Sequence, residues 1–188
     1  MGTVGVMSLA ARDLPRRMTA DEFLAATDEL PRAQLIDGEL VEAVNPPRSR
    51  HQQIVQRLLV SFATGLGPAG HGELWLPQGL RVDDANVFVP DLFWIRAGTT
   101  LDPDAHVLDS VPPLVIEVLS PSTRAHDTGP KLDGYLRAGV TEVWLVDPDT
   151  PTITVHHRGQ APTTLVAGDI LTTPQIPDWE IDLTTLFA

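Results

Sequence analysis

Apolar residues recur along this chain with helical spacing in some segments and with strand-like spacing in others. Residues 49–66 carry them three and four positions apart, which predicts an amphipathic helix ending near Gly65. A shorter helix is predicted in "MTADEFLAATDEL", where Thr19 is a suitable N-terminal cap. A third is predicted in "DTGPKLDGYLRAG", with Asp127 or Thr128 as its cap and a glycine at its end.

The remaining apolar runs are short, rich in β-branched residues and typical of strands. Two of them flank Asp37-Gly38 in "QLIDGELVEAV", and this dipeptide strongly favours a two-residue hairpin turn. Further strands are predicted at residues 73–76, 79–82, 87–95 and 114–119, and in "EVWLVDP", "TITVHH", "TTLVAGD" and "WEIDLTTLF". This order of elements predicts a mixed α/β fold, with a central sheet flanked by helices.

Length and composition indicate one globular domain. The chain has 188 residues, 43% of them hydrophobic and 20% charged, which is enough for a sizeable core. We expect residues 1–17 to form a flexible tail and residues 18–188 to form the domain. Cysteine is absent, which excludes disulfides and thiolate metal sites. No apolar run approaches the roughly 20 residues of a membrane span, so a cytoplasmic protein is expected.

The formal net charge is −12, from 25 acidic residues against 13 lysines and arginines. This balance argues against a broad, non-specific coat of nucleic acid, because phosphate binding needs cations. Basic residues still gather in two segments, which could form a local patch. The first group is Arg48, Arg50 and Arg57, and the second is Arg124, Lys131 and Arg137. Ordinary surface charge is the alternative interpretation of each of these residues.

Two acidic residues interrupt runs that otherwise look buried. Asp91 lies within "VFVPDLFWI", and Glu117 lies within "PPLVIEVLSPST". Side chains alternate along a strand, so these acids can converge if their strands are neighbours. Ionised carboxylates brought together in apolar surroundings repel, and are usually held by a divalent cation or by one shared proton. Without thiolates or a clear histidine triad, the cation expected here is Mg²⁺ or Mn²⁺ rather than zinc.

Lys131 stands where a lysine is unfavourable, in the first turn of its predicted helix near the positive end of the helix dipole. Tyr135 follows one turn later, so both side chains could face the strand of Glu117. A lysine beside a metal-bound water and a phosphate could orient the nucleophile and offset developing charge. The simpler interpretations are a solvated lysine, a strand-edge acid at Asp91 and a buried arginine partner for Glu117.

Several segments of the sequence carry a family resemblance. They are "LIDGELVEAV", the helix start "RSRHQQIV", "VPDLFWI", "PPLVIEVLSPSTRAHDTGPKLDGYLRAGVTEVWLVDP" and "AGDILTTPQIPDWEIDLTTLF". Together they resemble the Uma2 family, also called DUF820, of restriction-endonuclease-like proteins. The likeness runs from about Met18 to Phe187 and is most specific from Val111 to Pro148. Because that family is similar to the PD-(D/E)xK nucleases, the resemblance implies a restriction-endonuclease-like mixed central sheet flanked by helices, and metal-dependent phosphodiester hydrolysis.

The resemblance also implies roles for individual residues. Pro90-Asp91 supplies the "PD" and Glu117 the second acid, so Asp91 and Glu117 would be the metal ligands. The lysine expected two residues after Glu117 is Leu119 in this chain. The resemblance suggests that Lys131 replaces that lysine from the adjoining helix.

Further polar residues are expected to support this site. Glu39 and His51 match recurrent polar positions of the family, as an outer metal ligand and a water or phosphate contact. Tyr135 is a third supporting candidate. The candidate DNA contacts are Arg48, Arg50, Arg124 and Arg137.

The sequence therefore predicts an endonuclease that hydrolyses phosphodiester bonds of DNA with Mg²⁺ or Mn²⁺, using Asp91, Glu117 and Lys131. The alternative is a nuclease-fold domain that has lost cleavage and serves as a nucleic-acid-binding or protein-interaction module. Leu119 and the acidic net charge favour that alternative. A homodimer fits the predicted activity, because one active site cuts one strand and two-fold pairing lets an enzyme cut both. No membrane partner is expected.

Overall fold

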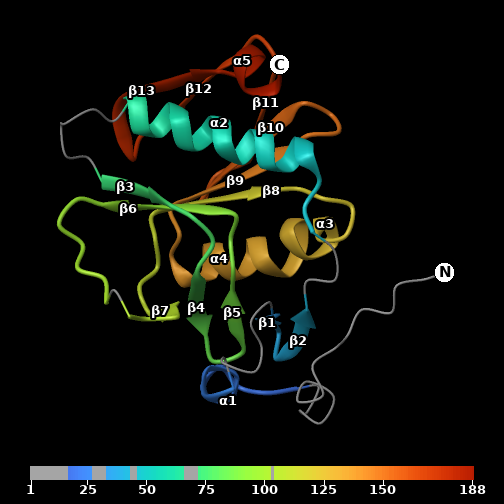
Figure 1. Cartoon of the computed structure of the whole chain (residues 1–188), viewed down its shortest axis with the longest axis vertical. Coiled ribbons are helices and arrows are strands. Elements are labelled where there is room, and N and C mark those ends of the chain that lie inside the picture. The colour runs from blue at the N-terminus through green and yellow to red at the C-terminus, as the bar shows by residue number, and fades with distance from the viewer. Residues whose placement is uncertain (1–16, 27–32, 43–45, 66–71, 103) are drawn as a thin grey trace.

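A six-stranded sheet dominates the computed structural model, which describes residues 17–26, 33–42, 46–65, 72–102 and 104–188. The strand order is β11-β10-β9-β8-β6-β3 (Figure 1). In that order the strands are Thr163–Val166, Thr152–His157, Glu142–Asp147, Leu114–Val118, Leu92–Arg96 and Gly72–Trp75. The neighbours β8 and β9 are parallel and the other pairs are antiparallel. The predicted mixed α/β architecture is confirmed.

A second sheet, of five strands, lies below the first in Figure 1, with the order β2-β1-β5-β4-β7. In that order the strands are Glu39–Glu42, Ala33–Ile36, Asn86–Phe88, Gly79–Asp83 and Val107–Leu108. The hairpin predicted at Asp37-Gly38 joins β1 to β2, and both turn residues have positive φ angles, 51° and 76°, as this turn requires. The six-stranded sheet corresponds to the predicted central sheet, and the separate five-stranded sheet was not predicted.

The helix α2, Ser49–Gly65, covers one face of the six-stranded sheet (Figure 1). Its buried apolar residues, spaced as the sequence predicts, are Ile54, Val55, Leu58 and Phe62. The Phe62 ring lies 6.1 Å from the ring of Trp144 on β9 and 4.3 Å from that of Trp179, between ring centroids. Burial of these rings fixes α2, and with it the residues of its first turn, on the sheet.

The last part of the chain adds a small layer beside α2. The strands β12, Ile170–Thr173, and β13, Ile176–Asp182, form a two-stranded sheet of their own. The segment "WEIDLTTLF", predicted as a strand, changes within its length into the helix α5, Leu183–Phe187. The Asp182 carboxylate accepts a hydrogen bond of 2.7 Å from the Thr184 N–H, which caps that helix and explains the change.

The predicted strand 87–95 is wrong, because the segment contains two strands that belong to different sheets. Asn86–Phe88 pairs in the five-stranded sheet, and Leu92–Arg96 pairs in the six-stranded one. Pro90, which has no N–H, cannot continue a strand ladder, and the N–H of Val89 donates instead to Oε1 of Gln34 at 2.8 Å. Asp91 therefore lies at the crossing between the sheets, directly before β6.

The helical segment after β8 also differs from its prediction. It begins at Arg124 in α3, Arg124–His126, so neither Asp127 nor Thr128 caps it. A π turn, Asp127–Lys131, follows and contains Pro130 and a non-helical Gly129 with φ −122° and ψ −107°. The helix α4, Leu132–Ala138, then ends at the predicted glycine, Gly139, whose φ is 106°. This segment lies between the two sheets (Figure 1).

The N-terminal region agrees with its prediction where it is described. The helix α1, Ala20–Ala25, begins at Thr19, which accepts from the Glu22 N–H, while Glu22 accepts from the Thr19 N–H. The predicted tail lies outside the described residues except for Arg17, which bridges to β2. Among the described helices, none has the length and apolar character needed to cross a bilayer.

The ion pair between Arg124 and Asp147 gives a prediction about acid stability. Arg124 donates two hydrogen bonds, of 2.8 and 2.9 Å, to the Asp147 carboxylate, and they lower the pKa of Asp147 to about 2. Because the folded pKa of Asp147 lies below its unfolded value of about 3.9, the ion pair stabilises the fold above pH 4, and this stabilisation is lost as the pH falls toward 2. Asp147→Asn should lower the free energy of unfolding by about 1 kcal/mol at pH 7.

Urea unfolding of both proteins between pH 7 and pH 2.5 checks this prediction. The difference in stability should narrow below pH 4, since the parent then loses the charge on Asp147. Asp149→Asn is a matched control, because Asp149 is exposed and its Oδ2 lies 3.8 Å from Arg124. A difference for Asp147→Asn that stays constant down to pH 2.5 would contradict the assignment.

Candidate functional site

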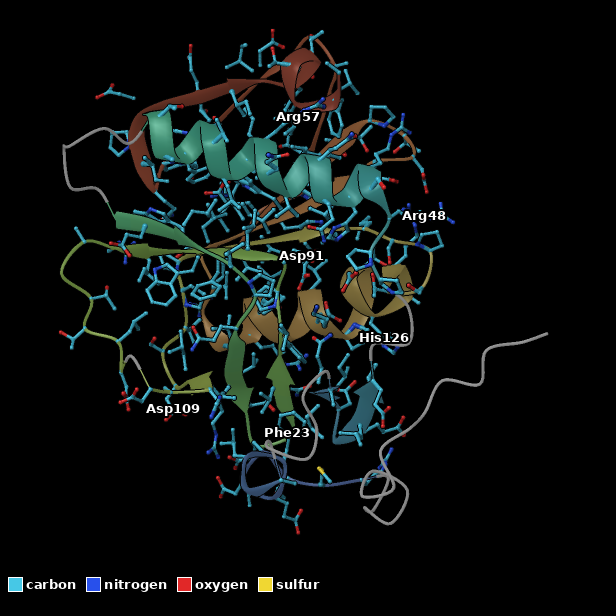
Figure 2. The ribbon with its side chains drawn as sticks, in the orientation of Figure 1. Phe23, Arg48, Arg57, Asp91, Asp109 and His126 are labelled. Carbon is cyan, nitrogen blue, oxygen red and sulfur yellow. The ribbon has the colours of Figure 1, made fainter. Side chains whose placement is uncertain are left out.

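A cleft of about 520 Å³ opens where the N-terminal end of α2 faces the segment that joins β8 to α4. In Figure 2, Arg48 marks that end of α2, and Asp91 lies between the levels of α2 and α4. The ionisable residues that line the cleft are Arg48, His51, Asp91, Glu117, Asp127 and Lys131. The structure thus brings the three predicted catalytic residues, Asp91, Glu117 and Lys131, into one cavity.

Asp91 is held between the edge of β8 and the first turn of α2. Its Oδ2 accepts a hydrogen bond of 2.7 Å from the Val118 N–H and lies 3.2 Å from Nε2 of His51. The strands β6 and β8 are paired, with Leu92 opposite Ile116, so the neighbour relation on which convergence of the acids depends is present. Oδ1 of Asp91 makes no hydrogen bond to any residue that the structure describes.

His51 is a buried partner of Asp91 rather than a surface residue of α2. Its relative exposure is 7%, and its Nδ1 has no hydrogen-bond partner in the described part of the chain. Burial acts to lower the pKa of His51, but the hydrogen bond to Asp91 and the charges of Asp91 and Asp127 outweigh it, so the pKa is raised. A proton on Nε2 is therefore favoured, and it points at Asp91.

Glu117 projects from the middle of β8 and is 2% exposed. Its Oε1 accepts hydrogen bonds from Nζ of Lys131 at 2.7 Å and from the hydroxyl of Tyr135 at 2.8 Å. Burial raises the pKa of Glu117 to about 8, against the opposing effect of Lys131. Both donors reach Oε1, which leaves Oε2 as the atom that binds a proton or another ligand.

Lys131 is buried, so its interpretation as a solvated helix residue is wrong. Its Nζ lies 2.7 Å from Oε1 of Glu117, 3.2 Å from Oδ1 of Asp127 and 3.4 Å from the carbonyl oxygen of Val89. An ammonium has three donors, and these acceptors match them. Burial acts to lower the pKa of Lys131, but the charges of Glu117 and Asp127 outweigh it, so the pKa is raised and the side chain stays cationic.

Asp91 and Glu117 each have a basic partner, so the unrelieved repulsion between them that the sequence predicts is absent. Asp91 has His51 as its basic partner, and Glu117 has Lys131. The charge of Asp91 still contributes to the raised pKa of Glu117, so the two carboxyls interact within the cleft. The sequence-based alternative of a buried arginine beside Glu117 is also wrong, because the partner is a lysine.

Tyr135 supports Glu117 from the next turn of the helix. Its side chain is 1% exposed, and its ring packs edge-on against Phe88 with 5.1 Å between centroids. Burial, with the nearby charge of Glu117, raises the pKa of Tyr135 well above its usual value. The hydroxyl therefore stays protonated and donates a hydrogen bond to Oε1 of Glu117. Tyr135 thereby fixes the orientation of the carboxyl group.

Asp127 belongs to the site although sequence reasoning treated it as a helix cap. It is 3% exposed, lines the cleft and forms an ion pair with Lys131. The signal that could have identified it is the acid-to-lysine spacing of four residues, which places both side chains on one helical face. The hydroxyl cluster of Ser120, Ser122 and Thr123, which was not predicted as part of the site, also lines the cleft.

The remaining predicted site residues lie at different distances from this centre. Glu39 is exposed on β2, 3.5 Å from Arg17, and is not among the residues that line the cleft. Arg48 lines the cleft and is exposed. The other arginines are engaged or remote: Arg50 donates to the carbonyl of Pro148, Arg124 to Asp147, and Arg137 is exposed on α4 outside the cleft.

The donor set suits a hard divalent cation in part. Oδ1 of Asp91 and Oε2 of Glu117 are carboxylate oxygens with no hydrogen bond to a described residue. Within the described ranges, no three histidine, aspartate or glutamate side chains form a group that could hold a metal ion. Mg²⁺ commonly needs only one or two carboxylates and fills its other positions with water and substrate phosphate, so these residues fit it.

A second cavity offers no comparable chemistry. It lies between α2 and α5 and encloses about 20 Å³, lined by residues that include Arg50, Arg57 and Phe187. A space of this size holds about one water molecule. The cleft is therefore the candidate site.

Comparisons with known proteins identify the fold and the family of the chain. A crystal structure of a "putative nuclease belonging to DUF820" from Anabaena variabilis ATCC 29413 superimposes with a TM-score of 0.79, at 21% sequence identity, over 90% of this chain and 97% of that one. The chain therefore shares the fold of that protein. No curated protein matches the chain. The profile of the Uma2 family, described as "Putative restriction endonuclease", matches residues 20–184, and the chain belongs to the Uma2 family.

Proposed function

We propose that this protein is a metal-dependent endonuclease that hydrolyses phosphodiester bonds of DNA. The observation that carries the proposal is the buried ammonium of Lys131, which reaches Glu117 inside the cleft that also contains Asp91. A cation, two acids and an accessible cavity are the groups that phosphodiester hydrolysis needs. Family membership and the nuclease-like fold support the same reaction class.

Mg²⁺ or Mn²⁺ would supply a water of lowered pKa and positive charge opposite the scissile phosphate. Asp91 would bind it through Oδ1 and Glu117 through Oε2, the oxygens that are free of hydrogen bonds to described residues. His51 holds the other oxygen of Asp91, and Tyr135 holds the other oxygen of Glu117. The protein thus orients both carboxylates before substrate arrives.

Lys131 would offset the negative charge that develops on the phosphate and orient the attacking water. Asp127 gives the ammonium of Lys131 a second carboxylate partner, so Lys131 would keep its position when Glu117 binds a metal ion. The position two residues after Glu117 is filled by the apolar Leu119, which is buried in the core. Lys131, on the π turn that follows β8, is thus the lysine that reaches the site in its place.

A catalytically inactive module that binds nucleic acid or protein is the second candidate. One observation favours it, namely that the described residues include no three-ligand metal group. Such a module would bind a partner without any dependence on Asp91 or Glu117. The homodimer and the cytoplasmic location stay predictions, and sedimentation of the purified chain tests the first.

Cleavage should require a divalent cation and both acids. Asp91→Asn and Glu117→Gln should each lower the rate at which a labelled oligonucleotide with single-stranded and duplex segments is cleaved in Mn²⁺ by at least about 10²-fold, the scale for loss of a key electrostatic group. Glu180→Gln, on the exposed face of β13, is the control and should keep the parent rate. Undiminished cleavage in excess chelator would show that the metal is not needed.

Lys131→Met should separate chemistry from metal binding. The variant should lose cleavage by at least about 10²-fold while still binding Mn²⁺ in calorimetry, because an ammonium stabilises charge but cannot ligate a metal. Above pH 8, where Glu117 is ionised, its metal-free form should be about 3–5 kcal/mol less stable than the parent, since Glu117 and Asp127 lose their buried partner; at lower pH, protonation of Glu117 should make the loss smaller. Added Mn²⁺ should recover part of that loss. A Lys131→Met protein with parental activity would remove Lys131 from the mechanism.

Mn²⁺ affinity should increase with pH up to about 8. The pKa of Glu117 is raised to about 8 in the metal-free protein, so metal must displace a proton below that pH. The affinity measured by calorimetry should rise about tenfold per pH unit between pH 6 and pH 7.5. Tyr135→Phe removes a hydrogen bond to the charged carboxylate and should move the rise to higher pH. An affinity that is flat over this range would contradict the assignment of Glu117 as a ligand.

A further inference from the structure

We propose that the cleft acts on an unpaired strand of DNA rather than on a duplex, an inference that rests on the nuclease function proposed above. The family description, "Putative restriction endonuclease", would imply a duplex substrate, whereas the fold by itself does not specify strandedness. The inference comes from the basic side chains, from the size of the cleft and from the surface of its rim.

Most of the described basic side chains already bond within the protein, four of them (Arg17, Arg81, Arg124 and Lys131) to carboxylates and three (Arg50, Arg57 and Arg96) to neutral oxygens. Those with protein partners are Arg17 with Glu39, Arg50 with Pro148, Arg57 with Leu186, Arg81 with Asp21 and Asp84, Arg96 with Gln175, Arg124 with Asp147, and Lys131 with Glu117 and Asp127. Among the described residues, the basic side chains without such a partner are Arg48, Arg137 and Arg158. Arg48 is the member of this group that lines the cleft.

This distribution does not suit duplex DNA. A duplex carries one negative charge per roughly 1.7 Å of its axis, and proteins that bind it tightly neutralise roughly 6–10 phosphates with lysine and arginine. The cleft instead combines Arg48, His51 and Lys131 with three carboxylates, from Asp91, Glu117 and Asp127. A row of cations along two strands is therefore missing from the described surface around the site.

The size of the cleft also favours an unpaired strand over a duplex. Its volume of about 520 Å³ lies within the range of sites for small ligands, roughly 300–1,000 Å³. Glu117 and Lys131, which a reacting phosphate must approach, are each 2% exposed. An unpaired strand can bend its backbone into such a cavity, whereas a base-paired duplex keeps its phosphates on a stiff and wide cylinder.

The rim of the cleft offers contacts that unpaired nucleotides can use. The prolines Pro46, Pro47, Pro77 and Pro121 are exposed on it, with the hydroxyl groups of Ser120, Ser122 and Thr123. Proline rings are apolar and can pack against base and sugar faces that stacking hides in a duplex, and hydroxyls can donate to phosphate oxygens and base edges. The rim thus offers an unpaired strand contacts that need no cation.

The test uses one DNA sequence in three forms, with the purified full chain. A labelled oligonucleotide is offered single-stranded, as a blunt duplex, and as a duplex with an unpaired flap. Cleavage is measured in Mn²⁺, and binding is measured by fluorescence anisotropy with the Glu117→Gln protein. We expect kcat/KM and affinity at least about tenfold higher for the single strand and the flap than for the duplex, with a shallow salt dependence.

Two variants examine the role of the free cation at the cleft. Arg48→Ala should weaken binding of the single strand and reduce the slope of log K against log salt by about 0.7, the effect of one phosphate contact. Arg158→Ala removes an exposed arginine away from the cleft and should change neither quantity. Equal effects of the two substitutions would overturn the assignment of the strand to the cleft.

The outcomes separate this inference from the function on which it rests. Duplex bound or cleaved as well as the single strand, or better, would overturn the strand preference while leaving the nuclease function intact. Preferential binding of the single strand without cleavage of any form would support the preference and reject the nuclease function. Preferential binding and cleavage together would support both.

Discussion

A buried ammonium holds the candidate site together. Nζ of Lys131 bonds to Glu117, Asp127 and the Val89 carbonyl, which come from a strand, a π turn and the segment that links the two sheets. Removing a cation from water is costly, and only such complete pairing makes its burial tolerable. The two sheets, the kinked helix and the acid on β8 must therefore keep their relative positions for Lys131 to remain buried.

The parts of the fold that depend on local signals could be predicted from the sequence. The Asp37-Gly38 turn, the capping box at Thr19 and the apolar stripe of α2 act through neighbours in the chain, and each is found as expected. The missed features include the separate five-stranded sheet, the helix α5, the break at Pro90 and the π turn around Gly129. At Pro90, a residue that looked tolerable in a strand takes a different path, supported by a contact between distant segments, Gln34 with Val89.

In the candidate site, too, some residues could be recognised from the sequence and others could not. Asp91, Glu117 and Lys131 stand out in the sequence because each is polar where its surroundings predict an apolar or neutral residue. Asp127 and the role of His51 as a buried partner could not be recognised in this way. An acid at a helix start is already favourable there, so the spacing of four residues to Lys131 is the signal in the sequence that points to Asp127. The partner of His51 lies on a different element, so only the assembled fold reveals that role.

Two arginines, one at the start of α2 and one at the start of α3, bind the turn between β9 and β10. Arg50 at the start of α2 donates to the Pro148 carbonyl, and Arg124 at the start of α3 binds Asp147 beside it. Because both walls are tied to the same short turn, neither can swing away without breaking a charged hydrogen bond. If the proposed function holds, an opening held in this way would admit substrates that already fit it and would need no closing movement. Substrate discrimination would then depend on the rigidity of a turn that does not line the cleft.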